Sequence, residues 1–218
     1  MPTDTFFNLP DEKREMIIDI AIKEFASHDY KGASLTRIVN KAGISKGSMY
    51  QYFENKKDLY FYLINMAGDM KLNYLTAQQD TIEDQDFFGM YKQLLLIGSK
   101  FNLTYPYHSK MAINAMKETN DELGDLANDI KKRADEYIKE MMKTAQNKGQ
   151  VRTDLDLDLM AFVTSRISIE LEEFVSSKFD FSFEEVYDAN DPQLPIDEDE
   201  LESILDEMMT ILQNGMKA

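Results

Sequence analysis

The chain contains no cysteine, only two histidines, and no hydrophobic run long enough to cross a membrane. The absence of cysteine excludes disulfide bonds, thiolate nucleophiles and cysteine-ligated zinc sites. No segment approaches the roughly 18 consecutive apolar residues of a transmembrane helix, and the N-terminus lacks the basic start and apolar stretch of a signal peptide. We therefore expect a soluble, cytoplasmic protein with no membrane partner.

Signatures of catalysis are equally scarce. Because His28 and His108 are the only imidazoles, few pairs of nucleophile and base are possible. The sequence has no phosphate-binding glycine loop, no HExxH and no GxSxG motif. The acidic stretches at 154–158 and 197–200 lack the spacing of a calcium loop. They precede or open predicted helices, where the helix dipole stabilises acidic side chains. We expect no enzyme activity, no metal site and no cofactor.

Charge is distributed unevenly along the 218 residues, whose net charge is −16. Residues 31–60 hold six cations and two anions, whereas residues 71–218 hold 15 cations and 30 anions. The acidic surplus is typical of a solvated surface that keeps a protein in solution. The small basic segment is the part of the chain that can attract nucleic acid.

Apolar residues recur with the period of an α-helix along nearly the whole chain. We expect helices over about residues 11–27, 34–42, 46–52, 56–78, 84–104, 107–118, 121–148, 156–177 and 199–213. No strand pattern is longer than FDFSF at 179–183, and the connection 178–198 is long for a compact domain. The chain is predicted to be all-α, with a small N-terminal bundle followed by a larger one.

Capping residues mark the ends of the first helices. Ser34 and Ser45 are good N-caps, and Asn55 followed by Asp58 forms a box-like pattern at the start of the fourth helix. Gly43 suits the left-handed position just after the second helix. Three short helices with a glycine-containing turn between the second and the third form a helix-turn-helix, whose last helix enters the major groove of DNA.

The third helix and the start of the fourth carry two unusual features. Gly47 lies inside a helix, where glycine costs about 1 kcal/mol relative to alanine. Lys56 and Lys57 open a helix, where the positive end of the dipole disfavours cations. Beside DNA both features make sense, because the glycine lets the duplex approach the backbone and the lysines attract the same phosphate as the helix N-terminus. The alternative is a tolerated defect beside a solvated face.

The stretch SLTRIVNKAGISKGSMYQYFENKKDL, residues 34–59, resembles the DNA-binding signature of the TetR (TetR/AcrR) family of bacterial repressors. The matching residues are Thr36, Ile38, Ala42, Gly43, Ser45, Gly47, Tyr50, Tyr52, Phe53, Lys56 and Leu59. The preceding IIDIAIKEFASHDYKGAS resembles the first helix of the family, so the similarity covers about residues 10–65. It implies a helix-turn-helix DNA-binding domain, here residues 1–55, and a helical ligand-binding and dimerisation domain, here residues 56–218.

By position, the resemblance implies two groups of DNA contacts. Phosphates would be held by Ser34, Thr36, Arg37, Tyr50, Tyr52 and Lys56. Bases would be approached by Lys46, Ser48 and Gln51, with Gly47 at the closest approach of the backbone. The family more usually has an aromatic residue or histidine at position 51. The glutamine can bond to adenine N6 and N7, and it leaves the operator sequence open.

The central helices are rich in methionine and aromatic side chains, which adapt to irregular apolar shapes and line many ligand pockets. The candidate ligand-binding residues are Met66, Met70, Phe101, Tyr105, Tyr107, His108 and Met111. The alternative is that they form ordinary core. The acidic character of this region favours a cationic or neutral lipophilic ligand over an anion.

The resemblance also implies a homodimer in which the last two helices of each subunit form a four-helix bundle. Broad apolar stripes in 156–177 and 199–213 support this, although an intrachain core is the alternative. The candidate interface residues are Phe162, Arg166, Glu170, Leu201, Leu205, Met208 and Leu212. Arg166 and Glu170, one turn apart, are predicted as an interface ion pair, with a pair buried within the chain or an anchor for a ligand carboxylate as alternatives.

Together these features predict a ligand-responsive transcriptional regulator. The simplest form is a repressor that binds a palindromic double-stranded DNA operator as a homodimer and is released by a small-molecule effector. An activator or a ligand-independent regulator of the same fold is the first alternative. The remote alternative is a protein-interaction module with a vestigial DNA motif, against which the intact Lys46, Gly47, Tyr50 and Lys56 argue.

Overall fold

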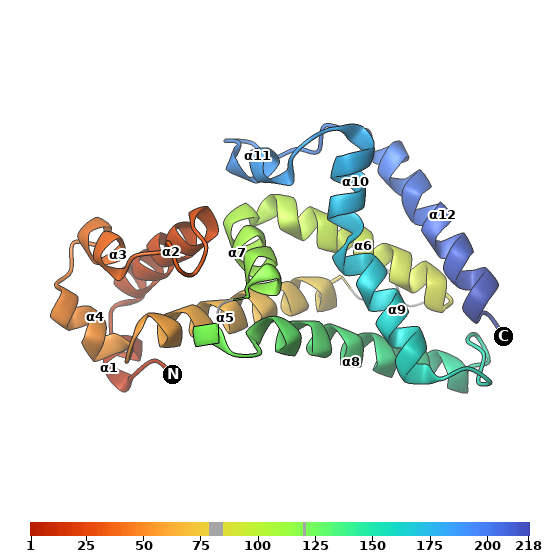
Figure 1. The fold of residues 1–218 in the computed structure, drawn as a ribbon, viewed down its shortest axis with the longest axis horizontal. Coiled ribbons are helices and arrows are strands. Elements are labelled where there is room, and N and C mark those ends of the chain that lie inside the picture. Colours follow the sequence, from red (N-terminus) through yellow and green to blue (C-terminus); the bar gives the residue numbers. More distant parts are fainter. Residues whose placement is uncertain (79–84, 120) are drawn as a thin grey trace. The chain divides into compact units, whose positions relative to one another are not determined.

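The computed structural model describes residues 1–78, 85–119 and 121–218, which form helices joined by mostly short connections (Figure 1). The α-helices are α1 (Asp4–Phe7), α2 (Asp11–Ser27), α3 (Leu35–Lys41), α4 (Lys46–Tyr52), α5 (Lys56–Thr76), α6 (Phe87–Thr104), α7 (Pro106–Lys117), α8 (Leu126–Asn147), α9 (Leu157–Ile169), α10 (Leu171–Phe179), α11 (Phe183–Asp188) and α12 (Glu198–Met216), with a 3₁₀ turn at Asp121–Leu123. These described residues contain no strand, only an isolated bridge between Val151 and Lys217. The predicted all-α fold is confirmed.

The short N-terminal helices form where their caps predicted. The Oγ of Ser34 accepts the N–H of Arg37 at the start of α3, at 3.4 Å. The Oγ of Ser45 accepts the N–H of Ser48 at the start of α4, at 2.9 Å. Gly43 has a φ of +63°, the left-handed conformation expected after α3. These boundaries depend on hydrogen bonds between residues only three or four positions apart.

One predicted helix is divided in two. The prediction of a single helix over 156–177 is wrong, because α9 and α10 meet at Glu170. The Oγ of Ser168 donates to the carbonyl of Thr164 at 3.0 Å, and such bonding to the preceding turn bends helices. The hydroxyl of Tyr91 donates to the same carbonyl at 3.1 Å. Helix α11, inside the expected long connection, was not predicted, nor was α1.

The chain packs into two compact units. Unit 1 comprises residues 1–72 and 105–127, and unit 2 comprises residues 73–104 and 128–218. Unit 1 therefore takes in α7 and most of α5, which differs from a division after residue 55. The boundary between a DNA-binding and a ligand-binding function stays a prediction.

Aromatic rings fill the interior of unit 1. Helix α2 packs along α7 and α3, and α4 packs against α3 and α1. Phe25 of α2 and Tyr60 of α5 are buried with ring centroids 4.8 Å apart, and Tyr30 lies 5.2 Å from Tyr60. The helices that carry the resemblance to the family's DNA-binding signature therefore share one aromatic core.

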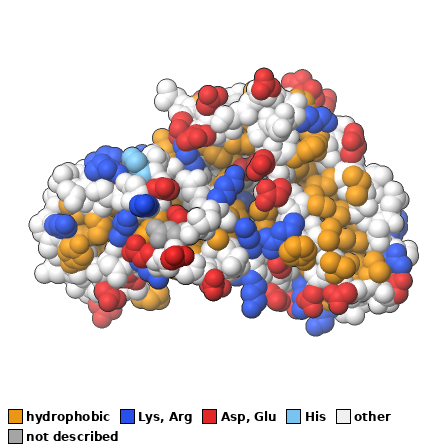
Figure 2. Space-filling model, viewed as in Figure 1, with side chains coloured by type: hydrophobic (Ala, Val, Ile, Leu, Met, Phe, Trp, Pro, Cys, Tyr) orange, Lys and Arg blue, Asp and Glu red, His pale blue; other side chains and the backbone are white. Residues whose placement is uncertain are grey.

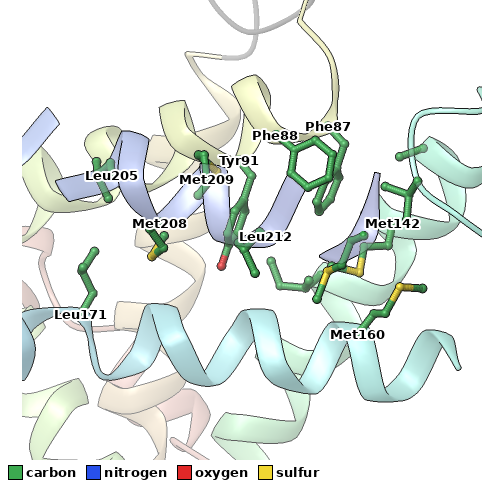
Figure 3. Packing of buried hydrophobic residues seen from close by; sticks show 14 of the residues in the cluster. Phe87, Phe88, Tyr91, Met142, Met160, Leu171, Leu205, Met208, Met209 and Leu212 are labelled. Carbon is green, nitrogen blue, oxygen red and sulfur yellow. The ribbon is translucent and has the colours of Figure 1, made fainter. Parts of the chain in front are cut away.

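The core of unit 2 is built from methionine, leucine and phenylalanine side chains, and α12 lies along α6 within it (Figure 3). The α12 stripe that we expected at a subunit interface, namely Leu201, Leu205, Met208 and Leu212, lies in this core. These four side chains are buried by their own chain, and their predicted place at a subunit interface stays a prediction. An apolar stripe predicts that a helix face is buried, but it does not predict which surface covers that face.

Candidate nucleic-acid interface

Helix α4 has one buried and one exposed face. Met49 and Tyr52 point inward and are buried, as is Phe53 at the helix end. On the other face Lys46, Gly47, Tyr50 and Gln51 are exposed and Ser48 is half-buried. The tyrosine ring of Tyr50 is 49% exposed. The structure therefore brings together on one surface the α4 residues that the sequence predicted as DNA contacts, except Tyr52.

Gly47 is not required by the folding of the chain. Its backbone is helical with a negative φ. A Cβ built on it would meet only the Oγ of Ser45, at an ordinary contact distance of 3.6 Å. Neither backbone conformation nor crowding therefore calls for a glycine at this position.

Tyr52 differs from Tyr50 in being buried. Its ring packs 5.8 Å from that of Phe6. Little of the side chain is left to meet a phosphate, so the structure supports a packing role for this tyrosine. Its predicted phosphate contact stays a prediction.

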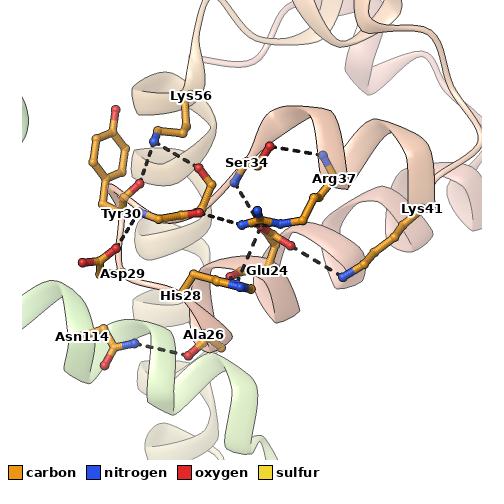
Figure 4. Close-up of polar contacts among 12 residues, drawn as sticks. Glu24, Ala26, His28, Asp29, Tyr30, Ser34, Arg37, Lys41, Lys56 and Asn114 are labelled. Carbon is orange, nitrogen blue, oxygen red and sulfur yellow. Dashed lines mark hydrogen bonds and ion pairs between the residues drawn. The ribbon is translucent and has the colours of Figure 1, made fainter.

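A buried carboxylate supports the start of α3 (Figure 4). Glu24 of α2 is 0% exposed. Its Oε1 accepts the Nε–H of Arg37 at 2.7 Å and the backbone N–H of Ser34 at 3.0 Å. Arg37 also donates to the carbonyl of Gly32 at 2.6 Å. Glu24 thus fixes two candidate phosphate ligands, Ser34 and Arg37, while Thr36 stands exposed beside them.

The ionisation of Glu24 follows from these contacts. Burial raises the pKa of the carboxyl. Hydrogen bonds from Arg37 and from the Ser34 N–H, together with the charges of Arg37 and His28, lower the pKa by more, so the net pKa is lowered. The second oxygen, Oε2, accepts no hydrogen bond from the described part of the chain. The ammonium of Lys41 lies 3.6 Å from this oxygen. The site therefore holds a carboxylate rather than a neutral acid.

Sequence reasoning missed Glu24. The signal was present, because Glu24 lies three residues after Ala21 and seven after Ile17, on the face that both bury. An acid on an apolar stripe predicts a buried partner, which here is Arg37.

The two lysines at the start of α5 have acceptors within the chain. The Nζ of Lys56 donates to the carbonyls of Tyr30 and Ala33 at 2.7 and 3.2 Å, and lies 4.3 Å from the centre of the Tyr30 ring. The Nζ of Lys57 donates to the carbonyl of Glu122 at 2.7 Å. These bonds explain cations at a helix N-terminus without DNA, and the phosphate role of Lys56 stays a prediction.

The candidate ligand residues are divided between the units. Phe101 belongs to unit 2 and is buried, and the other six belong to unit 1. Within unit 1, the ring of Tyr105 lies 5.9 Å from that of His108. Burial lowers the pKa of His108, with Asp19 acting in the opposite direction, so this imidazole is neutral at pH 7. Met111 is buried, whereas Met66, Met70 and Tyr107 are half-buried. Their role in ligand binding stays a prediction.

Unit 2 has a small pocket of its own. Its volume is about 20 Å³, roughly the room of one water molecule. Helices α6, α10 and α11 supply most of its wall, and none of the seven candidate ligand residues lines it. The carboxylate of Glu172 in its wall accepts hydrogen bonds from Asn102 at 2.6 Å and from the hydroxyl of Tyr187 at 2.8 Å.

Unit 2 also exposes an apolar surface. Hydrophobic side chains gather over α9, α10 and α12 in the face viewed in Figure 2. The large hydrophobic side chains exposed on these three helices are Leu159, Phe162, Val163, Phe174 and Ile211, and the candidate Phe162 is 49% exposed. We call these five side chains together the apolar face.

Arg166, beside this apolar face, pairs with a residue that the sequence did not suggest. Its guanidinium donates two hydrogen bonds to the carboxylate of Asp135 on α8, both at 2.7 Å. Glu170, the predicted partner, is exposed at the junction of α9 and α10. Within the chain Arg166 therefore pairs with Asp135 of α8, and the predicted place of Arg166 and Glu170 at a subunit interface stays a prediction.

Comparison with known proteins bears on these surfaces. The family model described as "Bacterial regulatory proteins, tetR family" matches residues 17–63, which run from α2 into α5. A crystal structure of a TetR family transcriptional regulator from Chloroflexus aurantiacus J-10-FL is 31% identical, covers 100% of this chain and 99% of that chain, and superposes with a TM-score of 0.75. The similarity therefore extends over both units.

Two curated bacterial proteins are more distant relatives. The fatty acid metabolism regulator protein of Bacillus subtilis is 24% identical over 149 residues, covering 67% of this chain and 75% of the relative. The probable acrEF/envCD operon repressor of Escherichia coli K12 is 24% identical over 159 residues, covering 69% of this chain and 70% of the relative. Among residues 1–78, 85–119 and 121–218, no helix combines the length and apolar character needed to span a membrane.

Proposed function

Because this chain belongs to the TetR family of bacterial transcriptional regulators, we propose that it binds a palindromic DNA operator as a homodimer and represses transcription until a small-molecule effector releases it. Helix α4 is the recognition helix of this proposal. Lys46, Ser48 and Gln51 approach the bases, and Tyr50 donates its exposed hydroxyl to a phosphate.

The observation that carries the proposal is Gly47. It lies in the first turn of α4, on the exposed face of the helix, and a Cβ there would meet nothing closer than 3.6 Å. Glycine in a helix costs about 1 kcal/mol relative to alanine. A fold that gains nothing from this glycine is consistent with a partner whose surface must come within contact distance of the α4 backbone, as the wall of the major groove does.

The test is Gly47→Ala, with Gly68→Ala as its matched control. Gly68 is also an exposed helical glycine of unit 1, and a Cβ there would meet nothing within 4 Å. We expect both variants to be stabilised by roughly 0.5–1 kcal/mol. Only Gly47→Ala should lose affinity, at least about tenfold, for duplexes that the unmodified protein selects from a random pool.

Fluorescence anisotropy with the selected duplex measures this affinity, and urea unfolding measures the stability. Unchanged DNA affinity of Gly47→Ala would contradict the close approach of the α4 backbone. Failure of the unmodified protein to enrich any duplex would contradict the proposed function itself.

The homodimer is supported by the apolar face of unit 2. Leu159, Phe162 and Val163 project from one side of α9 at the spacing of i, i+3 and i+4, and Ile211 on α12 is 69% exposed. Contiguous exposed apolar patches mark interaction sites, and a second copy of the chain offers the same apolar chemistry. A dimer presents two recognition helices, which favours a palindromic operator with half-sites about 34–36 Å apart or somewhat more.

A lipophilic effector is supported by the methionine and aromatic composition around α5 to α7 and by the presence of a fatty acid metabolism regulator among the relatives. The effector is expected to weaken operator binding, and by linkage the operator must weaken effector binding by the same factor. Thermal-shift screening of lipophilic and cationic compounds, followed by titration with and without operator, tests this. Equal effector affinities in the two titrations would exclude the compound as the inducer.

A further inference from the structure

We infer that the N-terminal arm, defined as Thr3 together with α1, positions the recognition helix α4 by capping its C-terminal end. Thr3 is the capping residue and Phe6 is the anchor that holds it in place. The effect on DNA binding rests on the proposed function, whereas the capping itself is a property of the free protein.

The C-terminal end of helix α4 lacks a capping turn of its own. It has only seven residues, and the last carbonyls of any helix have no partner within the helix. Helix α3 ends in the left-handed Gly43, but Phe53 after α4 is extended, with a φ of −134° and a ψ of 139°. The backbone of α4 therefore continues without the turn that usually satisfies the terminal carbonyls.

Thr3 supplies both missing donors from a distant part of the chain. Its Oγ1 donates to the carbonyl of Gln51 at 2.6 Å. Its backbone N–H donates to the carbonyl of Tyr52 at 3.0 Å. One residue thus satisfies two adjacent carbonyls in the last turn of the recognition helix.

The hydroxyl of Thr3 does not make the hydrogen bond that is usual for an N-cap threonine. Thr3 is the N-cap residue of α1, where a threonine hydroxyl usually accepts an N–H of its own helix. No such side-chain bond forms in α1. The hydroxyl instead serves α4, which indicates that residue 3 is placed for the recognition helix rather than for α1.

Phe6 keeps Thr3 at this position. The Phe6 side chain is 0% exposed. Its ring centroid lies 4.8 Å from that of Phe53 and 5.8 Å from those of Tyr52 and Tyr62. Such aromatic contacts add to the burial of apolar area, so the arm is packed between the end of α4 and helix α5.

The arm acts next to a predicted base contact. The carbonyl that Thr3 Oγ1 binds belongs to Gln51, whose side chain is exposed on the DNA-facing side of α4. An isolated helix of this length is unstable in water, and its last turn frays first. By holding the last turn closed, Thr3 determines the direction in which Gln51 leaves the helix.

The experiment compares Thr3→Val with Thr5→Val. Valine at position 3 keeps the shape and the backbone N–H but removes the donor to Gln51. Thr5 is an exposed threonine of the same arm, so its replacement controls for the loss of a hydroxyl. Hydrogen exchange of the free proteins reports the closure of α4. We expect amides at 51–53 to exchange at least threefold faster in Thr3→Val only, with α2 unchanged.

The DNA readout uses the duplex selected by the unmodified protein and a scrambled duplex. We expect Thr3→Val to weaken binding of the selected duplex three- to tenfold, to leave the scrambled duplex unaffected, and to keep the salt dependence unchanged, since no phosphate contact is lost. A salt slope lowered by about one would instead make Thr3 a phosphate ligand and overturn the inference.

Phe6→Ala removes the anchor and should reproduce both effects more strongly, with exposed Phe7→Ala as its control. If Phe6→Ala does not fold, Thr3→Val alone decides the matter. Unchanged exchange at 51–53 and unchanged selectivity in Thr3→Val would exclude the arm as a positioning element, even if DNA binding by the unmodified protein is firmly established.

Discussion

The exposed face of α4 in unit 1 and the apolar face of unit 2 are both exposed surfaces, but their side chains have opposite chemistry. The first exposes a lysine, a glycine, a tyrosine hydroxyl and a glutamine. The second exposes leucine, phenylalanine, valine and isoleucine, with Leu159 59% exposed. A polyanion needs hydrogen-bond donors and close backbone approach, whereas an apolar face gains free energy only against another apolar surface. The two surfaces therefore call for different partners.

The two surfaces also differ in how they are supported. Beneath the DNA-facing helices lie polar contacts that fix directions, such as the Glu24–Arg37 pair at 2.6 Å. Beneath α9 lies a core of methionine and leucine, with the Arg166–Asp135 pair at its edge. Directional contacts suit a surface that must match a fixed array of phosphates and bases, while apolar packing suits one that needs only area and shape.

The largest expected effect comes from breaking the apolar face. We expect Leu159→Glu combined with Phe162→Glu to convert the proposed dimer to monomers at micromolar concentration, because each subunit would bring two carboxylates into the apolar interface. Operator affinity should fall roughly a hundredfold as the second half-site is lost. Sedimentation velocity and anisotropy measure the two effects. Met16→Glu, at an exposed methionine of unit 1, is the control. A dimer that survives the double substitution would show that this face is not the interface.

A second test removes the charge beneath the polar surface. Glu24→Gln keeps the shape but deprives Arg37 of its carboxylate, and we expect unit 1 to lose about 1–3 kcal/mol of unfolding free energy at pH 7. Exposed Glu15→Gln on the same helix is the control. Equal denaturant midpoints for the unmodified protein and Glu24→Gln would mean that the buried pair contributes no net stability.

The same pair predicts a pH dependence. The folded pKa of Glu24 lies below the ordinary pKa of a glutamic acid side chain. Its contribution to stability is therefore fully present above that value and is lost as the pH falls through the folded pKa. Melting temperatures of the unmodified protein and of Glu24→Gln should converge as the pH is lowered from 7 to 3. A constant difference between the two curves would contradict the lowered pKa.

A smaller effect separates the roles of Tyr50 and Lys56. Tyr50→Phe should weaken binding to all duplexes alike by roughly three- to tenfold without changing stability, because it removes an exposed donor to phosphate. Lys56→Ala should lower stability by about 1 kcal/mol, because two carbonyls lose their donor. If the slope of log affinity against log salt concentration falls by about one in Lys56→Ala, Lys56 does contact a phosphate.

The smallest expected effect concerns preference rather than strength. Gln51→Ala should change affinity for the best duplex only a few-fold, but it should relax selection at one base pair, since a good bidentate contact discriminates by about 1–3 kcal/mol. Repeating the selection with the variant measures this. If the variant selects the same consensus with the same base preference at every position, Gln51 does not contact a base.

The helices of unit 1 from α2 to the start of α5 could be predicted nearly to the residue. Ser34, Ser45, Asn55 and Gly43 act on amides and carbonyls within a few positions, as the Asp58 N–H bond to Asn55 at 2.9 Å illustrates. The break at Glu170 was not predicted, because the apolar helical period continues across it. Helix α1 was missed because four residues are too few to display a period.

What the sequence by itself determined is therefore local: the helical period, the caps, and the exposed side of a helix-turn-helix whose residues lie within one short stretch. The tertiary structure alone decided the partners. Lys56 reaches a carbonyl 26 positions away, Arg166 a carboxylate 31 positions away, and Thr3 a carbonyl 48 positions away. It also decided that the α12 stripe is buried within its own unit while the apolar side of α9 is not. Local hydrogen bonds are encoded in the spacing of residues, whereas these contacts exist only once distant segments have packed together.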